Sequence, residues 1–131
     1  MARPKGKARP RLLTEVELEL MTALWHSGEA TVRDVLESLP PGRKLAYTSV
    51  STILRILEKK KLVKARKVGK AHVYTPALTK SDYESRSLRH LVDKVFDGTP
   101  SAMVMRLLDD RGVTKDELRQ IQALLEERLQ K

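Results

Sequence analysis

Apolar residues recur at helical spacing in two groups of segments along the chain. In the first group, apolar positions three and four residues apart predict three helices, over residues 14–27, 31–39 and 47–61. In the second group, the same spacing predicts three more helices after Thr79. Between the groups, residues 62–68 and 71–75 have the pattern of two short strands with a turn at Gly69. The pattern predicts a mainly α-helical fold with one small β-hairpin.

Capping residues mark the predicted helix ends. Four predicted starts carry a threonine followed three residues later by an acid, which is the capping-box arrangement: Thr14 with Glu17, Thr31 with Asp34, Thr79 with Asp82, and Thr114 with Glu117. Gly28, Gly98 and Gly112 stand where a helix needs a left-handed terminal residue. Pro40 and Pro41 cannot continue a helix, so the second and third helices are separate.

Three helices followed by a hairpin are the element order of a winged helix-turn-helix, which we assign to residues 12–78. Residues 1–11 place Arg and Lys between Pro and Gly and are predicted to be a disordered basic arm. Residues 79–131 form three amphipathic helices that are too small to bury much surface alone. We therefore expect a helical dimerisation domain whose interface includes Leu88, Leu91, Val95, Leu107, Leu108, Ile121, Leu124 and Leu125.

Charge is divided unevenly between the two halves. Residues 1–78 hold 16 Lys and Arg against 7 Asp and Glu, which accounts for the whole net charge of +9, whereas residues 79–131 hold ten of each. A basic half that coincides with a winged helix-turn-helix indicates a polyanion as its partner. Few aromatic residues are present, so readers of single-stranded nucleic acid, which stack bases on aromatic rings, are disfavoured.

The helix predicted over residues 47–61 has the composition of a recognition helix. Short hydroxyl side chains allow a helix to approach base edges closely, and longer basic side chains reach guanine or phosphate oxygens. The residues predicted to contact DNA from this helix are Thr48, Ser49, Ser51, Thr52, Arg55 and Lys59. From the hairpin, Arg66, Lys67 and Lys70 are predicted to neutralise phosphates beside the groove. The expected partner is double-stranded DNA.

Residue types exclude several classes of function. Cys is absent, and His26, His72 and His90 stand on different elements without carboxylates at ligand spacing, so we expect no metal site, no cofactor and no enzyme activity. Neither a membrane span nor a signal peptide is indicated, because no apolar run approaches the ~18 residues that a span requires. These features favour a cytoplasmic protein.

Three segments carry a resemblance to a known family: LTEVELELMTALWHSGEATVRDVLESL, LAYTSVSTILRILEKKKLV and HVYTPALTKSDYES. From Leu13 onward the chain resembles the penicillinase-repressor family, the BlaI/MecI/CopY type of transcriptional repressor. The resemblance implies a homodimeric winged-helix repressor on a palindromic operator, with the C-terminal helices forming the dimer. It also implies inactivation by proteolysis in the C-terminal domain, triggered in the β-lactam branch by a membrane-embedded sensor metalloprotease.

The chain departs from the family pattern at three places. The family's cleavage position falls on Arg106 and Leu107, where resistance repressors have Asn and Phe. The copper-responsive branch uses a cysteine-rich C-terminal motif, which this chain lacks, so release by copper through that motif is excluded. The family's base-reading positions correspond to Ser49 and Ser51, and Ser51 replaces a longer basic side chain, which implies a different operator sequence.

Two other hypotheses stay open from the sequence alone. The winged helix could serve protein assembly, with its basic residues only solvating the surface. Alternatively, a repressor of this kind could be released by a small ligand and not by cleavage.

Overall fold

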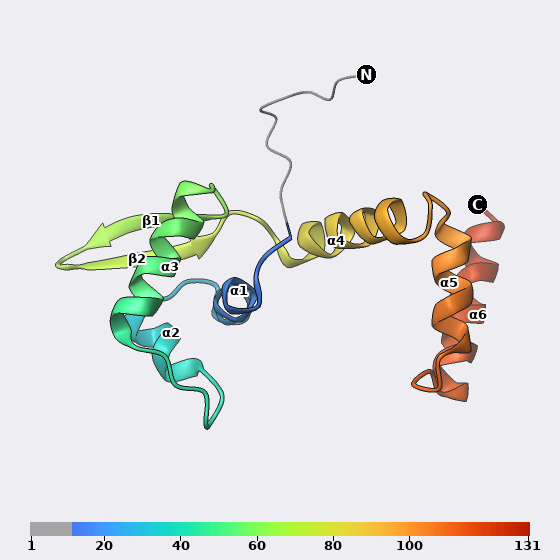
Figure 1. The fold of residues 1–131 in the computed structure, drawn as a ribbon, viewed down its shortest axis with the longest axis horizontal. Helices are drawn as coiled ribbons and strands as arrows, with labels where there is room; N and C mark the ends of the chain where they lie inside the picture. Colours follow the sequence, from blue (N-terminus) through green and yellow to red (C-terminus); the bar gives the residue numbers. More distant parts are fainter. Residues whose placement is uncertain (1–11) are drawn as a thin grey trace, which may run out of the picture. The chain divides into compact units, whose positions relative to one another are not determined.

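The computed structural model describes residues 12–131, so the predicted basic arm of residues 1–11 lies outside the described residues (Figure 1). The chain forms two compact units, and the boundary follows Ser87. We call residues 12–87 the winged-helix unit and residues 88–131 the C-terminal unit. The sequence predicts the boundary between the winged helix and the C-terminal helices after residue 78, nine residues earlier. The winged-helix unit extends further because the first turns of the next helix pack against it.

Three helices begin the winged-helix unit: α1 (Glu15–Ser27), α2 (Val32–Ser38) and α3 (Tyr47–Lys59). The capping boxes at Thr14 and Thr31 both form, so α1 and α2 begin where the sequence predicts. The end of α3 was predicted at Lys61, but the helix ends two residues earlier. Lys61 adopts a left-handed conformation with φ of 66°, which stops the helix and turns the chain toward the hairpin.

Strands β1 (Val63–Val68) and β2 (Ala71–Pro76) pair in antiparallel register, from Val63 opposite Pro76 to Val68 opposite Ala71. Gly69 opens the predicted two-residue turn with φ of 62°, a conformation that glycine adopts at little cost. The hairpin is also tied to the α1–α2 connection, because Ala30 and Tyr74 exchange two backbone hydrogen bonds of 3.0 and 2.8 Å. The hairpin is thereby anchored at its base, and its turn extends away from the core.

The core of the winged-helix unit lies where α1, α2, α3 and the base of the hairpin meet. Its fully buried side chains come from each of these elements and are Leu20, Met21, Leu24, Val35, Val50, Leu54, Leu57 and Val63. Burial of each Leu or Val contributes about 1.5–3 kcal/mol relative to exposure. The apolar face predicted for α3 is confirmed, since Val50, Leu54 and Leu57 are its buried residues.

Three further helices follow the hairpin: α4 (Lys80–Val95), α5 (Pro100–Asp109) and α6 (Lys115–Leu129). Residues 88–131 are described in full, and Val92 is their one buried hydrophobic side chain. Their other apolar residues are half-buried or exposed. Across residues 12–131, no helix combines the length and the apolar character needed to cross a membrane.

Two glycines behave differently from the prediction. Gly112 is not left-handed, because α5 ends at Asp109 and the chain turns by other bonds, including one from the Gly112 N–H to Asp110. Gly42, in the α2–α3 connection, has φ of 88° and was not predicted to be left-handed. Gly28 and Gly98 are left-handed as predicted.

Candidate nucleic-acid interface

Helix α3 is held by one face and exposes the other. Burial of Val50, Leu54 and Leu57 fixes its rotation about its own axis, so the polar residues on the opposite side must face solvent. Five of the six predicted contact residues of α3 are exposed: Thr48, Ser49, Thr52, Arg55 and Lys59. The sixth, Ser51, is half-buried.

The exposed hydroxyls border a shallow depression. Thr48, Ser49, Thr52 and the half-buried Ile53 line an open hollow of about 320 Å³ on the surface of α3. The side chains around it are short, so a ligand edge can come close to the helix backbone. Such a surface suits a flat, hydrogen-bonding edge like that of a base pair.

Ile56 lies on the same exposed face and was missed from the sequence. Its side chain is 40% exposed although it is large and apolar. At about 100° per residue, it stands about 40° from Thr52 on a helical wheel. That angle was available from the sequence, but Ile56 was assigned neither to the apolar face of the helix nor to the DNA contacts. An exposed apolar side chain among hydroxyls can contact the methyl group of thymine.

Arg55 stands at the border between α3 and the hairpin. It acts electrostatically on Tyr74 of β2, as does Glu58. Burial is the main cause that raises the pKa of Tyr74 above its ordinary value; Glu58 adds to this effect and Arg55 opposes it. Helix α3 itself packs against β1, so the helix and the base of the hairpin are neighbours. Helix α3 and the hairpin therefore adjoin each other.

The predicted wing cations are all exposed but are not equivalent. Arg66 forms a 3.0 Å salt bridge with Glu29, and both side chains are more than half exposed. An exposed pair of this kind contributes little, so a phosphate can compete with Glu29 for Arg66. Lys67 lies opposite His72, and Lys70 lies in the turn. Among residues 12–131, neither Lys67 nor Lys70 forms a salt bridge with an acid.

The three lysines at the end of α3, Lys59 to Lys61, include one residue with a structural role. Lys60 donates a 2.7 Å hydrogen bond to Glu17, which also accepts the backbone N–H of Thr14. Burial alone raises the pKa of Glu17, but the bonds from Lys60 and Thr14 outweigh it, so the pKa is lowered. Lys60 thus joins the end of α3 to the start of α1, while Lys59 faces solvent.

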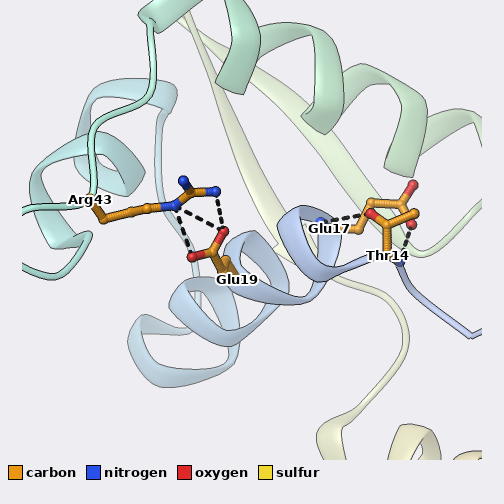
Figure 2. A network of polar contacts seen from close by, with 4 residues as sticks. All are labelled: Thr14, Glu17, Glu19 and Arg43. Atoms are coloured by element: carbon orange, nitrogen blue, oxygen red, sulfur yellow. Dashed lines mark hydrogen bonds and ion pairs between the residues drawn. The ribbon is translucent and has the colours of Figure 1, made fainter.

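A second ion pair joins the α2–α3 connection to α1. The guanidinium of Arg43 donates to both carboxylate oxygens of Glu19, at 3.0 Å from Nε and 2.9 Å from Nη2 (Figure 2). Figure 2 also shows the reciprocal bonds of Thr14 and Glu17 at the start of the same helix. Helix α3 is therefore secured to α1 beyond each of its ends.

In the C-terminal unit, the predicted interface residues carry apolar side chains toward solvent. Seven are exposed and Ile121 is half-buried; the exposed residues are Leu88, Leu91, Val95, Leu107, Leu108, Leu124 and Leu125. The predicted cleavage pair, Arg106 and Leu107, is exposed and lies inside α5. Among residues 12–131, no three His, Cys, Asp or Glu side chains are grouped to hold a metal ion.

Comparison with known proteins places the chain among bacterial regulators. It is 33% identical over 117 residues to the transcriptional regulator BlaI of Mycobacterium tuberculosis (strain CDC 1551 / Oshkosh), covering 87% of this chain and 85% of that protein. It is 26% identical over 115 residues to the penicillinase repressor of Bacillus licheniformis, covering 88% and 90%. The methicillin resistance regulatory protein MecI of Staphylococcus aureus (strain N315) is 20% identical over 113 residues, or 86% and 92%.

Among solved structures, the DNA-binding domain of the repressor BlaI matches 54% of this chain and 87% of that one, with 30% identity and a TM-score of 0.49. The penicillinase repressor family model matches residues 13–127, which include all six helices and both strands except the last residues of α6. The chain belongs to the penicillinase repressor family.

Proposed function

We propose that this protein is a transcriptional repressor that binds duplex DNA, with α3 in the major groove and the β1–β2 hairpin as the wing. The observation that carries the proposal is the division of α3 into a buried apolar face and an exposed face of hydroxyl and basic residues. Membership of the penicillinase repressor family supports it, because the relatives named above are repressors and regulators.

Base reading is assigned to the exposed hydroxyls of α3, and phosphate binding to the cations around them. Thr48, Ser49 and Thr52 donate to or accept from base edges, and Arg55 reaches guanine or phosphate oxygens. Lys67 and Lys70 bind phosphate from the wing without reading sequence. The start of α3 contributes too, because no side chain caps it and its first N–H groups carry partial positive charge.

We further propose that the repressor acts as a homodimer on a palindromic operator. The C-terminal unit supports this, because its apolar side chains are left largely exposed within one chain. Monomers rarely keep so much apolar surface in water, and a second copy is the partner that the family resemblance implies. Two α3 helices would then occupy half-sites about one helical turn, or about 34–36 Å, apart.

Release of the operator is proposed to follow cleavage between Arg106 and Leu107 by a membrane-embedded sensor metalloprotease. The cut separates α6 and the end of α5 from the rest of the chain, and with them more than half of the proposed interface. Since proteases bind extended substrates, the end of α5 must unwind first, and its position near the Asp110 turn favours this. Mass spectrometry after exposure to an inducer tests the route, and an intact chain excludes it.

Release by a small ligand is a second candidate. A groove of about 830 Å³ lies between α1 and the α2–α3 connection, with Leu18, Leu39 and Pro40 among its apolar residues. Arg43 and Glu19 stand at this groove, so a ligand there acts on the turn that positions α3. An inducer that abolishes DNA binding while the chain stays intact favours this route.

Footprinting combined with a salt series separates the repressor from a protein-assembly module. Fragments of the source genome are selected with purified protein and then footprinted, which also identifies the operator. A repressor protects a defined site, and its affinity falls steeply as salt rises because phosphate contacts release counterions. Absence of protection over its own upstream region and over all selected fragments contradicts the repressor proposal.

A further inference from the structure

The chain that leaves the hairpin is fixed to the winged-helix unit at Leu78. The backbone N–H groups of Ala77 and Leu78 both donate to the carbonyl of Leu62, at 2.8 and 3.2 Å. The carbonyl of Leu78 in turn accepts a 2.8 Å hydrogen bond from the indole Nε1 of Trp25 in α1. The Leu78 side chain is buried. These bonds attach the chain to the winged-helix unit immediately before α4.

A second attachment lies at Tyr83, about one turn into α4. Its ring centroid is 5.8 Å from that of Trp25, with the rings tilted by 36°. Its hydroxyl accepts a 3.1 Å hydrogen bond from the backbone N–H of Leu13, the residue before the α1 cap. The same tyrosine therefore contacts both the start and the last part of α1. We call Trp25, Leu78 and Tyr83 the aromatic latch.

A helix that is attached at two points has a fixed direction, whereas a helix that is attached at one point can rotate about that point. With Leu78 alone held, α4 could swing; with Tyr83 also held, the axis of its first turns is set relative to α1. Helix α4 is continuous from Lys80 to Val95. Its held first turns therefore lead into the C-terminal unit without a break in the helix. No other α4 side chain in residues 80–87 except Ser87 is even half-buried, so the latch is the main constraint on that direction.

We propose that the aromatic latch determines which half-site spacing the dimer accepts, with Tyr83 as its positioning residue. The inference rests on the proposed dimeric repressor. Each base pair inserted between half-sites moves one of them by about 3.4 Å and rotates it by about 34° around the DNA axis. A rigidly directed α4 tolerates such a change poorly, whereas a swinging α4 follows it. The latch therefore contributes to specificity without touching DNA.

A series of operators tests the proposal, with the half-sites of the selected operator moved apart or together by one, two and three base pairs. Binding is measured for the wild type, Tyr83→Ala, Tyr83→Phe and the control Glu84→Ala. Glu84 is the next residue of α4, is exposed and pairs with Lys80 alone. Loss of simultaneous binding to both half-sites costs on the order of 100-fold in affinity.

The wild type and Glu84→Ala are expected to show a narrow spacing optimum. At the other spacings, their operator affinity should fall by up to about 100-fold. Tyr83→Ala is expected to lose less than about tenfold across the series, because its α4 can adjust. Tyr83→Phe keeps the ring but not the acceptor for Leu13, so it gives an intermediate profile. Binding to a single half-site stays unchanged in each variant, which shows that the winged-helix unit is folded.

Different outcomes overturn the inference and the proposed function. If Tyr83→Ala and Tyr83→Phe both keep the wild-type optimum, the latch does not set the spacing, although the dimeric repressor stands. If Tyr83→Ala does not fold, the Tyr83→Phe profile alone decides. A wild type that binds one half-site as tightly as two contradicts the dimeric repressor itself.

Discussion

At the scale of single residues, Glu17 shows how a charge can be kept in a small core. Its side chain is almost completely buried, yet it caps α1 and receives Lys60 from the end of α3. An unpaired carboxylate in this position would be costly, so each of its bonds offsets part of the cost of burial. The pairing also removes Lys60 from the cations available to DNA.

Replacing Glu17 by Gln tests this pairing through the pH dependence of stability. The lowered pKa means that the ionised carboxylate stabilises the fold above the unfolded pKa, about 4.5, and that this stability is lost as pH falls through the folded value. Gln keeps the capping bonds but not the charge. Urea unfolding should show a loss of about 1 kcal/mol at pH 7, since Lys60 is partly exposed, and a flatter decline below pH 5.

Glu37→Gln is the matched control, because Glu37 is exposed on α2 and has no salt bridge among the described residues. It should follow the wild-type acid profile. An acid profile of Glu17→Gln that coincides with the wild type contradicts the assigned role.

Lys67 and Arg55 allow the two kinds of DNA contact to be separated. Lys67→Ala should weaken binding almost equally for all sequences and reduce the slope of log affinity against log salt by about one unit. Arg55→Ala should weaken binding to the operator more than binding to unrelated DNA. Titrations at several salt concentrations measure both, with Lys94→Ala, which removes a charge from the C-terminal unit, as control. An unchanged slope means that Lys67 does not contact phosphate.

At the scale of elements, the sequence predicted helices and strands well because their patterns are local. Capping threonines and apolar spacing predicted where the helices begin to within one or two residues of the observed starts. The Gly69 turn formed as expected. The predictions that failed concern single residues at the ends of helices, where the path of the following chain decides the backbone conformation. Gly112 is not left-handed, and Lys61 is, because neighbouring turns close differently from the pattern.

Ile56 tests whether the exposed face of α3 reads DNA. Ile56→Ser should lower the free energy of unfolding by about 1–2 kcal/mol, because the side chain is 40% exposed and its covered part loses apolar burial. It should also lower the affinity for the operator, most strongly where Ile56 contacts a thymine methyl group. Paired measurements of urea unfolding and operator binding check this.

Leu54→Ala is the contrasting variant on the opposite face, where burial is complete. It should cost about 2–5 kcal/mol of stability through the cavity it leaves. Unchanged operator affinity in a folded Ile56→Ser protein places Ile56 outside the DNA contact.

At the scale of the whole molecule, the C-terminal unit depends on what covers its apolar residues. Leu124→Asp or Leu125→Asp should shift the proposed dimer to monomer, because a charge in an apolar interface has no partner there. Operator affinity should fall with it, by on the order of 100-fold, as one half-site is lost. Sedimentation and binding measure the two effects, with the exposed neighbour Glu126→Ala as control. If the Leu124→Asp protein sediments as a dimer, the dimer interface does not include Leu124.

The sequence by itself determined the elements, their order, the two faces of α3 and the division of charge, because each depends on residues close together in the chain. Only the tertiary structure decided which side chains from distant segments meet. Glu17 with Lys60, Arg43 with Glu19, and Trp25 with Tyr83 lie far apart in sequence, and no periodicity brings them together. Their contacts arise from core packing, which selects among many pairings that the same local patterns permit.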